Sequence, residues 1–319
     1  MTQALCVGID VSKASLEVAF GSSGEVRSVA NESIAIESLA AQLLKLGPEL
    51  VVMEATGGYE RMAAALLWDA GLRVVIANPR QLRQFREGMG QHAKTDRLDA
   101  RMIAQWAEHR RPEVRPLPDA QARELSELLA RRRQLLEMLV AERLRRAQVL
   151  GKSVRKELDA SIGSLERRLK RLESEIEQRI GKSDLWQRTR ELLESVPGVS
   201  KVTSFMLIAE LPELGTVDHR RLASLTGLAP YVRQSGQWRG QAMISGGRAA
   251  VRSALYMAAV SASRWNPALH PFYQRLLERG TPRKKALIAV ARKLLVILNA
   301  IVRDRAPWRP PCLATPAKS

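Results

Sequence analysis

The amino-acid sequence predicts an α/β domain followed by a mostly helical remainder. Over residues 1–109, short apolar runs alternate with amphipathic segments, which is the pattern of a sheet covered by helices. After a proline-rich linker at 110–118, apolar residues recur at helical spacing almost to the end of the chain. The predicted fold class is therefore α/β plus all-α, with a mixed sheet in the first domain.

The first domain opens with three predicted strands and a helix. Residues 5–20 contain an apolar run ending at Asp10 and then an alternating segment, which together predict two strands joined by a tight turn. Residues 25–31 predict a third strand. The amphipathic stretch 33–47 predicts a helix that ends at Gly47, because glycine readily takes the left-handed conformation of a helix end.

A strand–helix–strand–helix order completes this domain. An apolar run that finishes at Glu54 predicts a buried strand, and two glycines then turn the chain into a helix over 59–70. Residues 72–78 predict a further strand, which a proline stops. We expect a loop with two glycines to lead from there into a helix over 96–108.

The second part of the chain begins with two long predicted helices, at about 119–150 and 153–181. Leucine and isoleucine alternate four and three residues apart from Leu158 to Ile176, a heptad seam that forms an antiparallel hairpin within the chain or pairs two subunits. Residues 131–171 hold 13 Lys and Arg against 5 Asp and Glu, a net charge of +8. The coil is therefore also a basic rod, suited to lie along a phosphate backbone.

Three regions divide the remainder after the linker. A coiled-coil region over 119–185 precedes a helical C-terminal domain over 186–306, and we expect the tail at 307–319 to be disordered. Within the C-terminal domain, residues 192–211 predict a helix-hairpin-helix, a motif that offers backbone N–H groups to a phosphate. Residues 231–265 form a polar, glycine-rich arm that leads into a helix, and two more helices follow at about 267–279 and 281–305.

Charge and composition exclude several classes of protein. The net charge is +18, yet residues 1–110 hold 12 Lys and Arg against 13 Asp and Glu, so this part carries −1 and the remaining 209 residues carry +19. This distribution indicates a reaction module joined to a module that grips a polyanion. Two cysteines and four scattered histidines give neither a disulfide framework nor zinc spacing. No signal or membrane-spanning pattern is present, so we expect a cytoplasmic protein.

Four carboxylates occupy informative places in this scheme. Asp10 and Glu54 end predicted strands, and Asp96 and Asp99 share one face of the helix that closes the domain. Carboxylates that converge from separate elements suit Mg²⁺, and two such ions would clamp the attacking and leaving oxygens of a phosphodiester displacement. Taken singly, an Asp at a strand end is usually a turn former, and Asp96 competes with Thr95 as the helix N-cap. The four together follow the chain order of a ribonuclease-H-like nuclease fold.

The motifs around these carboxylates resemble one family of transposases. "VGIDVSK" with Asp10, "VVMEATGGYE" with Glu54 and "AKTDRLDARMIA" with Asp96 and Asp99 are similar to the DEDD set of the insertion-sequence family IS110. "VPGVSKVTSFMLIAEL" and "LASLTGLAPYVRQSGQWRGQAMISGGRAAVRSALYMAA" are similar to the C-terminal transposase domain of that family. The resemblance runs from about residue 4 to residue 305.

The resemblance implies a fold, an activity and partners. Such proteins have an RNase H-like (RuvC-like) N-terminal domain and are recombinases that excise and insert their own element through a circular intermediate. They combine a DEDD site, implying Mg²⁺ at Asp10, Glu54, Asp96 and Asp99 as two ions with Mn²⁺ able to substitute, with a serine that matches Ser245. A non-coding bridge RNA pairs with target and donor DNA. The active assembly is a tetramer in the bacterial cytoplasm, associated with the nucleoid, whose composite site takes the DEDD residues from one subunit and the serine from another.

The residues around Ser245 suit this role on chemical grounds. A hydroxyl that attacks phosphorus keeps the bond energy in a phosphoserine ester, so strands can be rejoined without ATP. Two glycines follow the serine and allow a phosphate to approach the backbone. Arg248 and Arg252, four residues apart, can hold phosphate oxygens. The alternative is that Ser245 merely caps a helix that begins near Gly247.

Other basic and aromatic residues carry weaker expectations. Lys13 and Lys94 lie beside the acidic motifs and are candidates to steady phosphates, although surface lysines usually have no special role. Trp238 and Trp265 either stack on bases or pack in the core.

Two other functions are compatible with the same residues. A Mg²⁺-dependent nuclease or junction resolvase would use the four carboxylates alone and would hydrolyse strands without a covalent intermediate. A nucleic-acid-binding scaffold with a decayed metal site would bind without cutting, but the complete set of four carboxylates argues against decay. A nuclease would release free 5′-phosphate ends, whereas a recombinase would leave protein joined to DNA.

Overall fold

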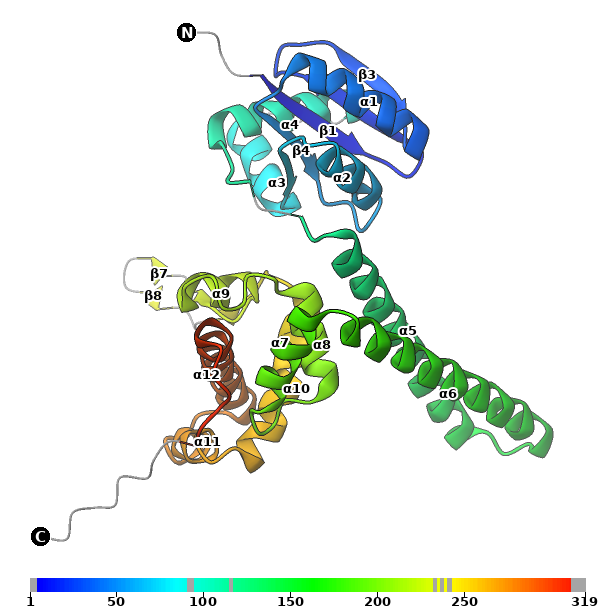
Figure 1. The fold of residues 1–319 in the computed structure, drawn as a ribbon, viewed down its shortest axis with the longest axis vertical. Coiled ribbons are helices and arrows are strands. Elements are labelled where there is room, and N and C mark those ends of the chain that lie inside the picture. The colour runs from blue at the N-terminus through cyan, green and yellow to red at the C-terminus, as the bar shows by residue number, and fades with distance from the viewer. Residues whose placement is uncertain are drawn as a thin grey trace, which may run out of the picture. The chain divides into compact units, whose positions relative to one another are not determined.

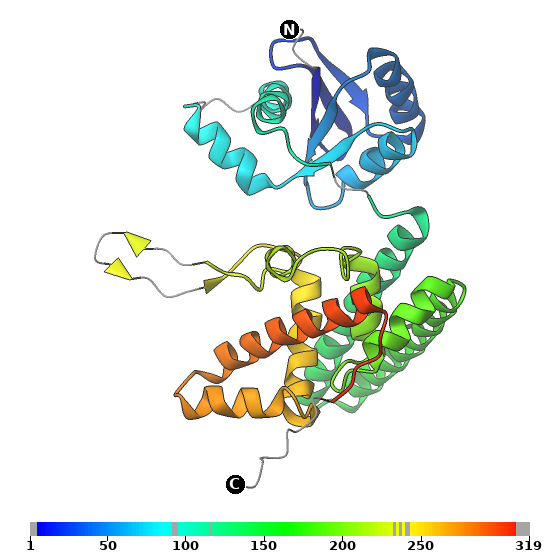
Figure 2. The same cartoon turned by 60° about the vertical axis from the view of Figure 1, so that its left-hand side comes forward.

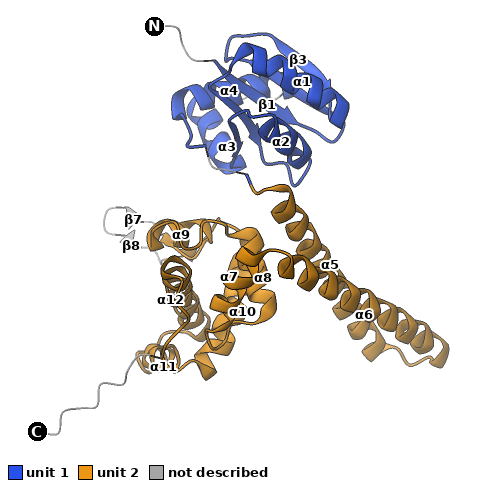
Figure 3. Cartoon of the chain, viewed as in Figure 1, with its two compact units in different colours: residues 1–117 blue, residues 118–319 orange. Residues whose placement is uncertain are grey.

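The computed structural model describes residues 5–90, 95–114, 117–231 and 243–310, together with the backbone of 234–235 and 238–239. The chain forms two compact units, residues 1–117 and 118–319, which are distinguished by colour in Figure 3. The boundary between them falls inside the proline-rich stretch at 110–118.

A five-stranded mixed sheet forms the centre of the first unit. Its strand order is β3-β2-β1-β4-β5. Strands β2 and β3 run antiparallel to their neighbours, whereas β4 and β5 run parallel to β1 and to each other. All five strands match predicted segments; their bounds are β1 Cys6–Val11, β2 Ser15–Phe20, β3 Val26–Ala30, β4 Leu50–Glu54 and β5 Val74–Ala77.

Helices cover both faces of this sheet (Figure 2). Because successive side chains of a strand point to opposite faces, Val7, Ile9 and Val11 of β1 enter one core with α1 and α2, and Cys6 enters another with α3 and α4. The helix α1 ends at Gly47, which has a φ of 61° and takes the left-handed conformation, as predicted. The bounds are α1 Ser33–Leu46, α2 Glu60–Asp69, α3 Pro79–Gly88 and α4 Asp96–Arg110.

The helix α3 corrects an expectation from the sequence. The stretch after the last strand was expected to be a loop, but it is helical over Pro79–Gly88. Asn78 is the N-cap, and its side chain accepts a hydrogen bond from the backbone N–H of Arg80 at 2.9 Å. Pro79 stands in the first turn, where its missing N–H costs nothing, so this proline starts a helix in addition to ending a strand.

The second unit begins with a helical hairpin, α5 (Ala120–Gln148) and α6 (Lys152–Gly181), whose two helices lie side by side in Figure 1. Leu135 and Leu139 of α5 pack against Leu165 of α6, with other members of the heptad seam at the edge of the cluster. The seam therefore packs within the chain, which is one of the two arrangements that the sequence left open. We call α5 and α6 together the helical arm.

A helical bundle follows the arm. Its core combines side chains of α7, α8, α9, α10 and α12. Leu125 and Leu129 of α5 and Ile176 and Ile180 of α6 pack against Phe205 of α8, and this contact joins the arm to the bundle. The bounds are α7 Asp184–Glu194, α8 Lys201–Glu210, α9 His219–Leu225, α10 Ala249–Trp265, α11 His270–Glu278 and α12 Arg283–Asp304.

Short strands precede α10. They pair as β6 (Pro230–Tyr231) with β9 (Met243–Ile244) and β7 (Gln234–Ser235) with β8 (Trp238–Arg239), all antiparallel. The sequence predicted a glycine-rich arm here but not the strands.

The end of the chain differs from expectation at one point. Trp308 lies in the tail expected to be disordered, yet it packs against the core of the bundle, and its backbone N–H donates to Ser195 Oγ at 2.9 Å. In the described part of the chain, no helix is both long and apolar enough to cross a membrane.

Candidate active site

Asp10 and Glu54 lie next to each other on neighbouring parallel strands. Ile9 of β1 is in register with Met53 of β4, so Asp10 and Glu54 are the next positions along the two strands. Alternation of side chains puts Asp10 on the same face as Cys6, the face on which α4 packs. The apolar runs before both carboxylates form the buried interior of the sheet, and each carboxylate stands where burial decreases.

The helix α4 brings Asp96 and Asp99 to this face of the sheet. Thr95, not Asp96, is the N-cap, because the Thr95 Oγ accepts a hydrogen bond from the backbone N–H of Leu98 at 3.3 Å. The side chain of Asp96 is exposed and is not used as the cap, so it is available for another role. Asp99 is only 5% exposed, which is unusual for a carboxylate.

The electrostatics of Asp10 show that the other three carboxylates lie close enough to act on it. Burial raises the pKa of Asp10 to about 6, and repulsion from Asp99, Asp96 and Glu54 adds to this effect, while a hydrogen bond from the backbone of Val11 opposes it. Like charges therefore gather at this end of the sheet, at a cost that a bound cation would relieve. Over the described residues, however, no three His, Cys, Asp or Glu side chains form a ready-made metal cage.

Three further charged residues border the site and were missed from the sequence. Glu17 of β2 stands directly opposite Asp10 in the antiparallel pair, and its carboxylate lies 3.9 Å from Arg97 Nε. Arg86 of α3 donates from Nη2 to Asp99 Oδ1 at 2.5 Å. Pairing the first two predicted strands places Glu17 opposite Asp10, whereas nothing places Arg86, because the sequence predicts a loop for its segment.

The loop after Glu54 is fixed by Glu60. The Glu60 carboxylate accepts hydrogen bonds from the Thr56 N–H at 3.0 Å, the Thr56 hydroxyl at 3.0 Å and the Gly58 N–H at 2.8 Å. Burial alone would raise the pKa of Glu60, but hydrogen bonds from the backbone N–H groups of Glu60, Gly58 and Thr56 and from the Thr56 hydroxyl lower it. Glu60 therefore holds the turn that follows the Glu54 strand.

Ser245 stands in a second, separate feature, a pair of glycine turns in the bundle. Gly246 and Gly247 have φ values of 70° and 64°, and Gly227 has a φ of 68°. A Cβ added to Gly247 would lie 2.2 Å from the backbone nitrogen of Gly227, so the turns at 226–227 and 245–247 press together. Ser245 is exposed and is not a helix cap, since α10 begins at Ala249 with Arg248 as its N-cap. The capping alternative is therefore wrong.

The two arginines after Ser245 already have partners within the chain. Arg248 makes a two-pronged ion pair with Glu213, at 2.5 and 2.7 Å, and its backbone N–H donates to Leu225 O at 2.9 Å. Arg252 Nη1 donates to the carbonyl oxygen of Gly246. These bonds shape the turn around Ser245, and phosphate binding by either arginine stays a prediction.

The remaining candidates are placed unevenly. Lys13 is exposed, just after β1, whereas Lys94 and the side chain of Trp238 lie outside the described residues. Trp265 is 76% exposed at the end of α10, which contradicts core packing for this residue.

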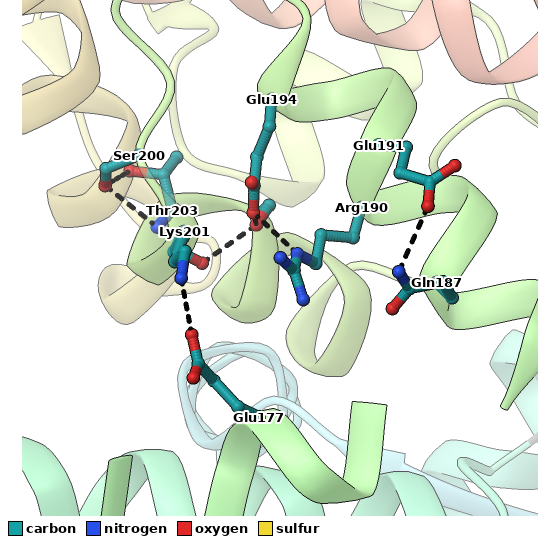
Figure 4. A network of polar contacts seen from close by, with 9 residues as sticks. Glu177, Gln187, Arg190, Glu191, Glu194, Ser200, Lys201 and Thr203 are labelled. Atoms are coloured by element: carbon teal, nitrogen blue, oxygen red, sulfur yellow. Dashed lines mark hydrogen bonds and ion pairs between the residues drawn. The ribbon is translucent and has the colours of Figure 1, made fainter. Parts of the chain in front are cut away.

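The predicted helix-hairpin-helix is present as α7, a turn and α8. Gly198, with a φ of 102°, faces α10, since an added Cβ would lie 2.7 Å from Ala262. Polar contacts around the hairpin are shown in Figure 4: Lys201 Nζ reaches Glu177 of the helical arm at 2.7 Å, and Glu194 accepts from Arg190 at 3.1 Å. The hairpin therefore joins the arm to the bundle, and phosphate binding by its backbone stays a prediction.

The helical arm carries both paired and outward-facing basic residues. Arg132 pairs with Glu173 at 2.6 Å and Arg146 with Asp159 at 2.6 Å, so part of the positive charge ties α5 to α6. Arg167, Lys170 and Arg171 of α6 instead line an open groove together with Ser174.

Comparisons with known proteins identify the family of this chain. A transposase family model named for its DEDD residues matches residues 7–153, and the model "Transposase IS116/IS110/IS902 family" matches residues 190–274. The pilin gene-inverting protein of Moraxella bovis is 30% identical over 263 residues, which are 81% of this chain and 81% of that protein. The chain belongs to the IS116/IS110/IS902 family of transposases.

Shorter matches to proteins of other insertion elements agree with this assignment. An uncharacterized 43.6 kDa protein of insertion element IS110 from Streptomyces coelicolor is 32% identical over 117 residues, covering 35% of this chain and 28% of that protein. A 42 kDa protein of IS900 from Mycobacterium paratuberculosis is 30% identical over 134 residues, covering 39% of this chain and 32% of that protein. Members of this family recombine DNA, and the DEDD transposases generally depend on divalent metal ions.

Proposed function

We propose that this transposase excises and inserts its own insertion sequence by cutting DNA and rejoining it through a phosphoserine at Ser245, with Asp10, Glu54, Asp96 and Asp99 as the acidic site. The observation that carries most weight is the relative named for inverting a pilin gene. Inversion needs both ends of a segment to be cut and joined again, which a hydrolytic nuclease does not do.

The sheet supports an RNase H-like (RuvC-like) assignment of the first unit. Three antiparallel strands are followed by two that are parallel to the first, in the order β3-β2-β1-β4-β5. Acidic residues at the ends of β1 and β4 and on the helix α4 follow the chain order of such nucleases. The parallel strands present their carboxyl ends at one edge, where ligands of α/β sheets gather.

The proposed chemistry at Ser245 is a phosphoryl transfer. The Ser245 oxygen attacks the scissile phosphorus and forms a P–O bond, while the bond from phosphorus to one sugar oxygen breaks. The proton lost by the serine hydroxyl is balanced by the proton that the released sugar hydroxyl gains. The reverse attack by a sugar hydroxyl restores a phosphodiester, so neither step needs ATP.

The acidic site suits divalent cations by its donor set. Four carboxylates from three elements offer hard oxygen ligands, and their mutual repulsion at Asp10 indicates a local excess of negative charge. We propose two Mg²⁺ ions, with Mn²⁺ able to substitute. When bound, they would stabilise the negative charge that develops on the transferred phosphate.

Further partners are proposed from charge and from the family resemblance. The net charge of +18 suits a protein that holds DNA together with a bridge RNA pairing with target and donor. The outward-facing residues Arg167, Lys170 and Arg171 are the proposed contacts on the helical arm, and the active assembly is proposed to be a tetramer in the bacterial cytoplasm.

A denaturing trap tests the covalent step. Protein, candidate RNA from the flanks of the element, labelled DNA and Mg²⁺ are incubated and denatured, and the label that migrates with protein is measured. Wild type should carry label, whereas Ser245→Ala and Asp10→Ala should lose it. Ser253→Ala, which removes an exposed hydroxyl from α10, is the matched control and should keep it.

Other outcomes would point to the alternatives. Cut DNA without attached label, lost in Asp10→Ala but kept in Ser245→Ala, would identify a hydrolytic nuclease or junction resolvase and contradict the serine mechanism. Binding without any cut by wild type would indicate a scaffold.

A further inference from the structure

Arg86 places a positive charge inside the acidic site. Its guanidinium lies 2.5 Å from Asp99 Oδ1, and the side chains of Arg86 and Asp99 are only 20% and 8% exposed. The pair joins α3 to α4, two helices on the same face of the sheet. It is therefore an internal ion pair and not a contact between flexible surface groups.

A buried ion pair of this kind is hard to open. Removing one partner leaves an uncompensated charge in a poorly solvated place, which is strongly destabilising. Asp99 is the carboxylate that contributes most to the repulsion felt by Asp10, and Arg86 is the residue that pairs with it.

The same contact conflicts with cation binding. A guanidinium at hydrogen-bond distance from Asp99 Oδ1 occupies one ligand oxygen and repels a second positive charge nearby. Asp99 is also one of the three carboxylates whose charge acts on Asp10, so a cation bound among them would meet the charge of Arg86. Either Arg86 or a metal ion can use this oxygen fully, but not both.

We propose that Arg86 is the internal counter-ion of Asp99 in the metal-free enzyme and that a divalent cation must displace its guanidinium to take Asp99 Oδ1 as a ligand. The inference rests on the proposed function, since it takes Asp99 as a metal ligand. Competition of this kind lowers the affinity of the site for its cation.

Binding of Mn²⁺ to the full-length protein without nucleic acid tests the proposal. Free Mn²⁺ is followed by electron paramagnetic resonance, and the melting temperature is measured in EDTA. Arg86→Gln should lower the melting temperature in EDTA, because Asp99 loses its partner, and should lower the Mn²⁺ Kd by about tenfold, because the competitor is gone. The variant should therefore be less stable and yet bind Mn²⁺ more tightly. A merely structural role of Arg86 would lower the stability without raising the affinity for Mn²⁺.

Two variants control for charge. Arg86→Lys keeps a positive charge near Asp99, so its Kd should stay within about twofold of wild type. Arg83→Gln removes one exposed arginine from the same helix and should change neither measurement. A Kd that falls equally in Arg83→Gln would show a general effect of charge and would overturn the proposal.

The remaining outcomes each decide a different question. An Arg86→Gln protein that binds Mn²⁺ as weakly as wild type, or more weakly, would show that Arg86 only positions Asp99. An Arg86→Gln protein that binds no more Mn²⁺ than the double variant Arg86→Gln/Asp99→Asn would instead refute the proposed cation site itself. If Arg86→Gln is too unstable to titrate, the rise in melting temperature on adding Mn²⁺ must exceed that of wild type, and an equal or smaller rise contradicts the inference.

Discussion

Gly8 of β1 lies directly against the backbone of Ala100 in α4: a Cβ added to Gly8 would lie 2.2 Å from the Ala100 carbonyl oxygen and 2.4 Å from the Ala104 nitrogen. No side chain fits between strand and helix at this point. The close approach lowers the first turns of α4, with Asp96 and Asp99, toward Asp10 on the same strand face. A residue without a side chain therefore sets the spacing of the acidic site.

Gly8→Ala tests this spacing. The added methyl group would push α4 away from the sheet, and we expect a loss of stability of about 1–3 kcal/mol, typical of overpacking, together with weaker Mn²⁺ binding. Gly88→Ala is the matched control, because nothing lies within 4 Å of its added Cβ. Thermal unfolding and Mn²⁺ titration measure both effects, and wild-type Mn²⁺ affinity in Gly8→Ala would contradict the role given to this contact.

The raised pKa of Asp10 predicts a pH dependence of stability in the absence of metal. Burial and repulsion raise it from the ordinary 3.8 to about 6. Between these values the folded protein holds a proton that the unfolded chain has released, so stability falls as the pH rises through this window. Asp10→Asn cannot ionise and should melt a few degrees above wild type in EDTA at about pH 7.

The same comparison at low pH supplies the control. The difference should vanish near about pH 4, where Asp10 is protonated in the folded protein. Glu37→Gln, which removes an exposed carboxyl group from α1, should show no such difference at either pH. A gap between wild type and Asp10→Asn that is independent of pH would exclude ionisation of Asp10 as its cause.

The glycines after Ser245 should differ in their sensitivity to substitution. Gly246→Ala adds only the strain of a left-handed residue, roughly 1–2 kcal/mol, since nothing lies within 4 Å of its Cβ. Gly247→Ala adds the same strain and a collision with Gly227. We expect Gly247→Ala to lose the covalent protein–DNA product and Gly246→Ala to retain part of it. Equal losses in the two variants would show that conformation alone, and not the contact with Gly227, matters at Ser245.

The outward-facing charges of the helical arm predict a salt effect. Changing Arg167, Lys170 and Arg171 to Gln together should weaken nucleic-acid binding and reduce the slope of log affinity against log salt concentration by about 3, one unit for each lost phosphate contact. Fluorescence anisotropy at several salt concentrations measures this slope. The control is the double variant Lys45→Gln/Arg73→Gln in the near-neutral first unit, which should keep the wild-type slope. An unchanged slope in the triple variant would remove these residues from the interface.

The five strands could be predicted from the sequence because their signals are local. Apolar runs, alternation and the glycine at the end of α1 act over a few residues, and the strands and most helices match the prediction. The sequence does not predict the helix α3, because a proline at position 79 is compatible both with the end of a strand and with the start of a helix. Only the N-cap hydrogen bond to the Asn78 side chain shows that Pro79 starts a helix. The short strands before α10 carry no pattern of their own.

The grouping of the four carboxylates could also be predicted, since parallel strands bring their ends to one edge. Their neighbours could not. The position of Arg86 beside Asp99 depends on the helix α3, which the sequence does not predict. The role of Gly8 depends on the distance between β1 and α4, which no sequence pattern indicates. The roles of these residues in metal binding and catalysis stay predictions.

The contact between Gly227 and Gly247 links two stretches of chain that are about twenty residues apart, and this matters for building hybrid enzymes. If the turn at 245–247 is replaced by that of a relative, it will fit only if the turn at 226–227, against which it packs, is replaced together with it. The boundaries of the exchanged segment should therefore lie before Leu225 and after Arg252. The segment then includes the Leu225 carbonyl, both glycine turns and Arg252, which donates to Gly246 O.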